Sequence, residues 1–253
     1  MGTASLSQIV RHCDRTLRAA EVTDYDGAFN GLQVENSGKI TRIAAAVDAT
    51  LATLRMAAAA KAGLLIVHHG LFWNPRHPWT GRNFELMRLL LENNLAVYSS
   101  HLPLDLHPRL GNNVQLARAL GLRNLKPFFF EKNQHLGVQA AASIPLKELA
   151  RRLERIVHAE PVILQCGPTV CRRIGVVTGG AGSEMKRAAA EGVDTFITGE
   201  GPHWTFGLAQ ELRVNVLYGG HYATETFGVK ALAAELSRKF GVPWEFLDHP
   251  SGL

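Results

Sequence analysis

The feature that most constrains the fold is an internal near-repeat, in which similar stretches of sequence lie about half a chain length apart. RIAAAVDAT (residues 42–50) aligns with RIGVVTGGAG (173–182), and ENNLAVYSSHLPLD (92–105) aligns with ELRVNVLYGGHYATE (211–225). In both stretches, strand-like apolar runs alternate with amphipathic helical segments, a pattern typical of α/β folds. The sequence therefore predicts an α/β protein with two pseudo-repeated lobes.

The predicted strands and helices alternate along the whole chain, and no low-complexity linker separates two halves. We place a first lobe at 1–126 and a second lobe at 127–253, with one compact domain as the alternative. The strands are predicted at residues 43–47, 64–67, 96–99, 137–141, 174–177, 195–198 and 215–218. The helices are predicted at residues 5–17, 51–62, 83–93, 113–120, 146–157, 184–191 and 226–239.

The composition narrows the class of protein. The chain has 253 residues, of which 46% are hydrophobic and 19% charged, as is usual for a globular protein. No apolar run is long enough to span a membrane, and the N-terminal segment lacks a signal-peptide pattern. Three cysteines without a CxxC spacing favour a reducing compartment, so we expect a cytoplasmic protein. The net charge of +5 suits an anionic ligand, but no basic stripe predicts nucleic-acid binding.

Three short motifs at predicted strand ends carry the chemistry. His101-x-x-x-Asp105 and His221-x-x-x-Glu225 occupy matching places in the near-repeat, and the adjacent pair His68 and His69 ends another apolar run. Open α/β folds bind ligands at the carboxyl ends of their strands. Histidines and carboxylates gathered there are the ligands of a two-metal site, which we expect in a cleft between the lobes.

The spacing of these residues constrains their geometry. Residues four apart can share one face of a helical turn, so His221 and Glu225 can converge, whereas Pro103 indicates a loop or a helix start before Asp105. Neighbouring strand residues point to opposite faces, so His68 and His69 suit two metal ions better than one. Nitrogen and oxygen ligands without thiolate favour zinc, manganese, iron or cobalt, and one bridging carboxylate would leave open positions for substrate.

Two further segments carry weaker signals. GGAGS (179–183), which precedes a predicted helix, could cradle an anion or form a tight strand-to-helix turn. TGEGPHW (198–204) lies at the position equivalent to the His-His pair. Glu200 and His203 are therefore candidate cleft residues, Glu200 at the substrate or beside a ligand and His203 in proton transfer, with simple loop structure as the alternative.

Together, NGLQV, VHHGLFW, SHLPLDLHPRLGNN, TGGAGS, DTFITGE and GGHYATETFGV resemble the motifs of the Nif-three-like dinuclear-metal family, also labelled type 2 homologues of GTP cyclohydrolase I. The resemblance covers nearly the whole chain. It implies a two-lobed protein that assembles into a toroidal homohexamer with two metal ions per subunit. The metal ligands it implies are His68, His69, Asp105, His221 and Glu225, with Glu225 as the bridge.

The resemblance also implies a role for His101, which matches a position beside the metals and suits acid–base catalysis. From the open metal positions we expect a dinuclear metal-dependent hydrolase acting on a nucleotide or similar phosphorylated heterocycle. His101 or His203 would move the proton. The alternative is a metal-binding ring without catalysis, which would deliver metal ions or dock a protein partner.

Overall fold

The computed structural model describes residues 2–73 and 78–253, and its chain divides into two compact units. Unit 1 comprises Met1–Leu104 and Gly228–His249, and unit 2 comprises Asp105–Phe227 and Pro250–Leu253. Both are built from α-helices and β-sheets, which confirms the predicted α/β class. The boundary predicted between residues 126 and 127 lies inside unit 2, at the first residue of strand β7.

Unit 1 contains a five-stranded sheet in the order β13-β4-β5-β6-β2. Its centre is three parallel strands that follow one another along the chain, β4 (Ile43–Asp48), β5 (Leu64–His69) and β6 (Ala96–Ser99). β13 (Trp244–Phe246) adds a parallel edge beside β4, and β2 (Gly31–Val34) adds an antiparallel edge beside β6. The apolar runs predicted as strands form these central strands because both of their faces are buried.

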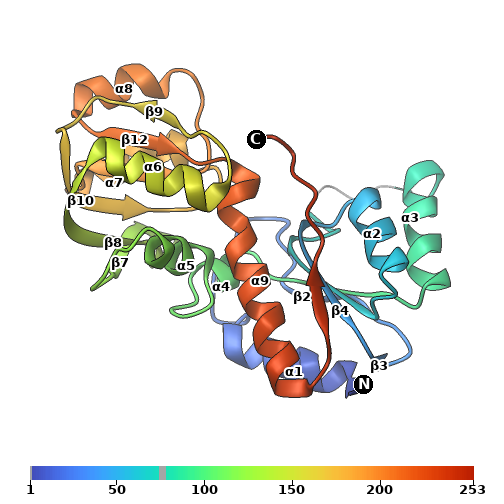
Figure 1. Cartoon of the computed structure of the whole chain (residues 1–253). Helices are drawn as coiled ribbons and strands as arrows, with labels where there is room; N and C mark the ends of the chain where they lie inside the picture. The colour runs from blue at the N-terminus through green and yellow to red at the C-terminus, as the bar shows by residue number, and fades with distance from the viewer. Residues whose placement is uncertain (1, 74–77) are drawn as a thin grey trace. The chain divides into compact units, whose positions relative to one another are not determined.

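Helices cover both faces of this sheet (Figure 1). α2 (Leu51–Ala59) and α3 (Gly81–Glu92) pack Leu54 and Leu90 into one apolar core with alternate residues of the strands. On the opposite face of the sheet, α1 (Leu6–Leu17) buries Ile9, Cys13 and Leu17. Two short strands, β1 (Ala4–Ser5) and β3 (Lys39–Ile40), pair separately.

Unit 2 contains a six-stranded sheet in the order β7-β8-β10-β11-β12-β9. β10, β11 and β12 are parallel and consecutive in this order, β9 pairs antiparallel with β12, and β7 and β8 form an antiparallel hairpin beside β10. The bounds are β7 (Lys126–Glu131), β8 (Gln134–Pro145), β9 (Val162–Leu164), β10 (Val170–Val176), β11 (Thr195–Thr198) and β12 (Asn215–Tyr218).

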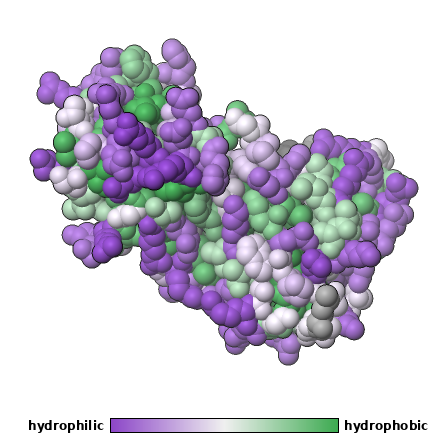
Figure 2. Space-filling view, viewed as in Figure 1, coloured by the Kyte–Doolittle hydropathy of each residue, from purple (hydrophilic) through white to green (hydrophobic). Residues whose placement is uncertain are grey.

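The helices of unit 2 are largely those that the periodicity predicts. α6 (Leu146–Val157) has the predicted bounds and buries Leu149 and Leu153, while its other side forms a hydrophilic surface (Figure 2). α5 (Asn112–Ala119) contributes to the same core, and Phe196 of β11 packs among buried phenylalanines on the opposite face. The remaining helices are η1 (Ala181–Glu184), α7 (Met185–Ala190) and α8 (Thr205–Leu212), and α8 is not among the predicted helices.

The two sheets share one arrangement, as the near-repeat predicts. In each, three parallel strands follow chain order, and an antiparallel strand lies beside the third. The sheets differ at the other edge, where unit 1 has the parallel β13 and unit 2 has the β7–β8 hairpin. This common strand order supports the duplication that the sequence predicts.

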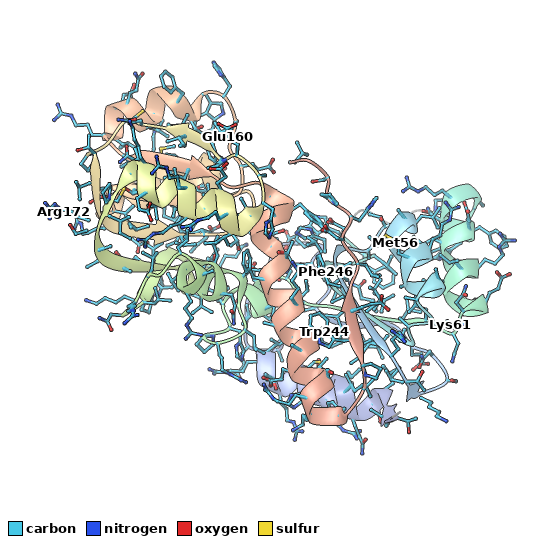
Figure 3. All side chains as sticks on the ribbon, viewed as in Figure 1. Met56, Lys61, Glu160, Arg172, Trp244 and Phe246 are labelled. Atoms are coloured by element: carbon cyan, nitrogen blue, oxygen red, sulfur yellow. The ribbon has the colours of Figure 1, made fainter. Side chains whose placement is uncertain are left out.

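One long helix belongs to both units in sequence. α9 (His221–Phe240) begins in unit 2 and, from Gly228, belongs to unit 1. In unit 1 it is followed by β13, which carries Trp244 and Phe246 (Figure 3), and Lys230 Nζ lies 4.1 Å from the centre of the Phe246 ring. None of the helices in the described ranges is both long and apolar enough for a membrane span.

Candidate metal centre

Three histidines of unit 1 meet at the carboxyl ends of β5 and β6. His68 and His69 end β5, and His101 follows β6 by two residues. Their ring centres lie 4.8 to 5.6 Å apart, and each offers a nitrogen within 4.8 Å of the others. His68 and His101 are buried, while His69 is half-buried. The predicted convergence at the strand ends is therefore present within unit 1.

The strand must end immediately after His69 for these rings to meet, and Gly70 permits this. A Cβ at Gly70 would lie 2.1 Å from the Gln33 amide nitrogen. That amide is itself held in place, because Gln33 Nε2 donates to the Phe29 carbonyl and Gln33 Oε1 accepts from the Leu71 N–H. A larger residue at this position would displace the segment that follows the two histidines.

Every ring of this cluster has its Nδ1 held by an acceptor. The Nδ1 of His68 lies 2.9 Å from the Ser100 carbonyl, and those of His69 and His101 lie 2.8 Å from the carboxylates of Asp48 and Asp24. A hydrogen bond of this kind places the proton on Nδ1 and leaves Nε2 as the basic atom of a neutral imidazole. Histidines that bind metals through Nε2 are oriented in this way.

Asp24 is a member of the site that the sequence does not predict. Its carboxylate accepts hydrogen bonds from His101 and from the Asn30 side chain, while Asn30 Oδ1 also accepts from the His101 N–H. Burial raises the pKa of Asp24, but His101 and these hydrogen bonds outweigh burial and lower the pKa below its ordinary value. Asp24 is thus a carboxylate built to stay ionised beside His101.

Exposed aromatic side chains lie next to the same histidines. The Trp73 ring lies edge-on to His101, with centres 4.6 Å apart, and 5.8 Å from His69. Tyr25 lies 6.0 Å from His101. Because 37% of Trp73 and 40% of Tyr25 are exposed, both can offer a ring surface to a ligand that reaches the histidines.

Unit 2 contributes a second group, in which one histidine lies between two carboxylates. His221 is the first residue of α9 and Glu225 lies one turn later, with 3.2 Å between His221 Nε2 and Glu225 Oε2. His221 Nδ1 lies 2.8 Å from Glu200 Oε1. The convergence of His221 and Glu225 on one helical turn is as predicted, and Glu200, predicted as a neighbour of the ligands, holds Nδ1 as the acceptors in unit 1 do.

The two carboxylates change the acidity of His221. Burial lowers its pKa, but the hydrogen bonds and negative charges of Glu225 and Glu200 outweigh burial and raise the pKa to about 9. Without a metal, the ring therefore carries a positive charge at neutral pH. A metal ion that binds at Nε2 must displace this proton.

The GGAGS segment supports Glu225 through a tight turn. Gly179 has a φ of +74°, and a Cβ there would lie 2.2 Å from Glu225 Oε1. Its N–H donates to Thr224 Oγ1, and its carbonyl accepts from the N–H groups of Gly199 and Glu200. Of the two interpretations of this segment, the strand-to-helix turn describes these contacts, and the glycine is required by both φ and space.

Asp105 is the first residue of unit 2 and the last residue of the one-turn helix α4 (Leu102–Asp105), so Pro103 lies in a helix start. Asp105 is buried, and its Oδ1 accepts a hydrogen bond of 2.7 Å from the Asn112 side chain. Asn113 donates to its backbone carbonyl. Of the two asparagines at the start of α5, the NN of the LGNN motif, Asn112 therefore fixes the carboxylate of Asp105 and Asn113 fixes its backbone.

His203, predicted as a proton carrier, is exposed in the turn before α8. The contacts that join Glu200, His221 and Glu225 in the described part of unit 2 do not include it. His101, by contrast, shares the ring contacts and the Nδ1 anchoring of His68 and His69. The geometry within the units therefore favours His101 over His203 for a role at this centre.

The donor set consists of imidazole nitrogens and carboxylate oxygens, which suits divalent ions such as zinc, manganese or iron. The three histidines of unit 1 could hold a metal ion. Cys13 and Cys171 are buried, and the pKa values of both thiols are raised by burial. The class of protein defined by this fold and site is an α/β protein with a cluster of oriented histidines that could hold a metal ion.

Comparison with known proteins places the chain more narrowly. The profile of Duf34/NIF3 (NGG1p interacting factor 3) matches residues 4–251, and the chain belongs to this family. A protein of Deinococcus radiodurans named "GTP cyclohydrolase 1 type 2 homolog" is 41% identical, with 100% of this chain and 96% of that protein covered. A protein of Pseudomonas aeruginosa with the same name is 37% identical, with 98% of each chain covered.

Solved structures share the fold over the whole length. The protein TTHA1606 from Thermus thermophilus superposes with a TM-score of 0.92 at 38% identity, covering 99% of this chain and 100% of that chain. Reduced HcgD from Methanocaldococcus jannaschii superposes with a TM-score of 0.86 at 26% identity, covering 98% and 99%. These matches confirm the resemblance on which the sequence-based expectations rest.

Proposed function

We propose that this protein is a dinuclear metal-dependent hydrolase that acts on a nucleotide or a related phosphorylated heterocycle. The observation that carries the proposal is that four histidines, His68, His69, His101 and His221, each have Nδ1 held by a carboxylate or carbonyl oxygen. Such anchoring is the arrangement by which proteins prepare Nε2 for a metal. It is present in both units.

We assign two divalent ions per subunit, zinc, manganese or iron, to five ligands. The ligands are His68, His69, Asp105, His221 and Glu225, with Glu225 as the bridge. The support comes from each unit separately, because Asn112 fixes Asp105 and Gly179 leaves room for the Glu225 carboxylate. Ions bound there would activate water and polarise the substrate as Lewis acids.

His101 is the residue that we assign to proton transfer. Asp24 is ionised and accepts the Nδ1 proton, so Nε2 of the same ring is free to accept a proton and return it. The pair resembles the carboxylate–histidine pair of many hydrolases in its logic, with Asp24 orienting the base. His203 stays a second candidate for this role.

The substrate class follows from the aromatic surface beside the histidines and from the names of the relatives. The exposed faces of Trp73 and Tyr25 suit a planar ring, since aromatic stacking favours heterocycles. Relatives carry the name "GTP cyclohydrolase 1 type 2 homolog", so ring opening and phosphoester cleavage are the reactions to examine. We further propose a cytoplasmic homohexamer.

The test is reconstitution of the metal-free chain with manganese, iron or zinc under anaerobic conditions, followed by assay against a nucleotide panel. Ring opening and phosphate release are both followed. We expect metal-dependent turnover that Asp105→Ala lowers by at least about a thousandfold, because it removes a ligand of the reacting centre. The control is Glu154→Ala, a change at an exposed position of α6 to which no role at the metals is assigned.

Unchanged turnover in an Asp105→Ala chain with verified metal content would contradict the proposal. Silence across the panel, with two metals verified per wild-type chain, would also contradict it. That second result would favour a metal-binding ring that delivers ions or docks a protein partner.

A further inference from the structure

Unit 2 contains a cavity that the metal-centre residues do not account for. It has a volume of about 590 Å³ and lies between the segment after α4, α5 with the loop that follows it, and the starts of β7 and β8. Small-molecule sites in proteins have volumes of about 300–1,000 Å³. All of its walls belong to unit 2, so the cavity is formed by a single compact unit.

The cavity has an apolar wall and a cationic one. Leu122 and Leu136 are buried and provide apolar surface, whereas Arg118, Arg123 and Lys126 are exposed. None of these three cations forms an ion pair with a carboxylate of the described chain, unlike Arg152 and Arg187 of the same unit. Three cations without acidic partners around one cavity suit an anionic group, and phosphate oxygens are strong acceptors for them.

Asp105 lines the cavity and is also one of the residues that we propose as metal ligands. Asn113, another wall residue, is fully engaged: its Nδ2 donates to the carbonyls of Asp105 and Leu136, and its Oδ1 accepts from the Thr178 N–H. This asparagine makes the wall beside Asp105 rigid. A molecule bound in the cavity can therefore contact Asp105.

We infer that this cavity binds the phosphate-bearing part of the substrate, with the phosphate at Arg118, Arg123 and Lys126 and an apolar face against the leucines. The inference deepens the proposed function. It rests on that function in one respect, because only the proposed hydrolase reaction places the reacting bond next to Asp105. Binding itself needs no metal. It selects phosphorylated over unphosphorylated molecules of otherwise equal structure.

The experiment is titration calorimetry of the metal-free full chain with guanosine monophosphate and guanosine, with inorganic phosphate as competitor. The double variant Arg123→Ala/Lys126→Ala should bind the monophosphate at least about tenfold more weakly, because charge-assisted hydrogen bonds are lost. Its residual binding should depend less on salt. Guanosine should bind wild type and variant alike, and more weakly than the monophosphate binds wild type.

A matched control removes one arginine and one lysine elsewhere in unit 2. In Lys147→Ala/Arg172→Ala both residues are exposed and neither lines the cavity, and Arg172 points away from the unit (Figure 3). This control should bind the monophosphate as wild type does. Equal affinity of the cavity variant and wild type, or an equal loss in the control, would overturn the inference.

The outcomes separate the cavity from the proposed function. If the monophosphate binds through the cavity and no metal-dependent turnover exists, the hydrolase proposal fails and the cavity assignment stands. If turnover exists and the cavity variant leaves KM unchanged, the assignment fails and the hydrolase proposal stands.

Discussion

The two units place functional groups at the same positions on the same strand order, yet they use different chemistry. Unit 1 ends β5 and β6 with three imidazoles, each held at Nδ1. After the equivalent strands, unit 2 places Glu200 and His221, and it adds Glu225 one turn after His221 in α9. The fold thus determines where ligands can stand, namely at the carboxyl ends of parallel strands, and the residues present determine what they bind.

The comparison also shows two ways to hold a ligand in place. In unit 1 the rings are fixed by acceptors from other segments, such as Asp24, which precedes His101 by 77 residues. In unit 2 the carboxylate of Glu225 is accommodated by a glycine turn that leaves no room for a side chain. Substitutions that remove either the acceptor in unit 1 or the glycine turn in unit 2 test whether the two units depend equally on these supports.

The largest effect on stability is expected at Gly179, where unit 2 leaves no room for a side chain. In Gly179→Ala the new Cβ meets Glu225 Oε1 and the residue must keep a positive φ, so folding stability should fall by about 1–3 kcal/mol. Metal content should fall with it, because Glu225 must move. Thermal unfolding and metal analysis measure both quantities.

Gly207→Ala is the matched control. Gly207 lies in α8 of the same unit, and a Cβ there meets no atom within 4 Å. Since alanine favours a helix by about 1 kcal/mol over glycine, this variant should be as stable as wild type or more so. Wild-type stability and metal content in Gly179→Ala would contradict the claim that unit 2 depends on this glycine turn to hold Glu225.

In unit 1 the corresponding test is Asp24→Asn, which keeps the size of the side chain and removes the charge that holds His101. Loss of an outer-shell partner of this type costs about 10- to 100-fold in metal affinity or activity. We expect turnover of the metal-loaded chain to fall within that range, because the His101 ring loses its preferred orientation. Steady-state kinetics across pH measures the loss, and rates identical to wild type at every pH would show that Asp24 has no orienting role.

Much of this fold is predictable from sequence, and the failures have physical causes. β6, β11, β12 and α6 have the predicted bounds because their burial patterns are strong. The predicted helix at 226–239 begins too late, since the glycines before His221 suggest a loop. The predicted lobe boundary falls at the start of β7, a strand that the sequence does not predict; its Pro127 is tolerated because β7 is an edge strand.

The candidate site divides in the same manner. His68, His69, His221 and Glu225 follow from strand ends and helical spacing, but Asp24 and Asp48 do not. Both act through contacts with residues far along the chain, which no local pattern contains. Asp48 ends β4 in register with His69, so the paired strands, once known, would have identified it.

A smaller effect is expected in unit 2, on the pKa of His221. Glu200→Gln removes one of the two charges that raise the pKa of His221, so this pKa should fall from about 9 toward its ordinary value of 6.5. Titration of the metal-free chain followed by NMR of the His221 ring measures it. An unchanged pKa would mean that Glu225 alone sets the acidity of His221.

The smallest effect concerns stability against pH. Because the folded-state pKa of His221 is raised, its contribution to folding is fully present below pH 6.5 and is lost as pH rises through about 9. The metal-free wild type should therefore lose more thermal stability between these pH values than Glu200→Gln does. Equal losses in the two chains would exclude this contribution.

The most direct test of the central claim is the position of the metals. Anomalous diffraction from crystals of the zinc- or manganese-loaded chain should show metal bound, at about 2.1 Å, to the Nε2 atoms of the histidines that we propose as ligands. The Nδ1 atoms should keep their protein acceptors. Ions found elsewhere, or bound through Nδ1, would contradict the claim that these histidines are oriented for a metal centre.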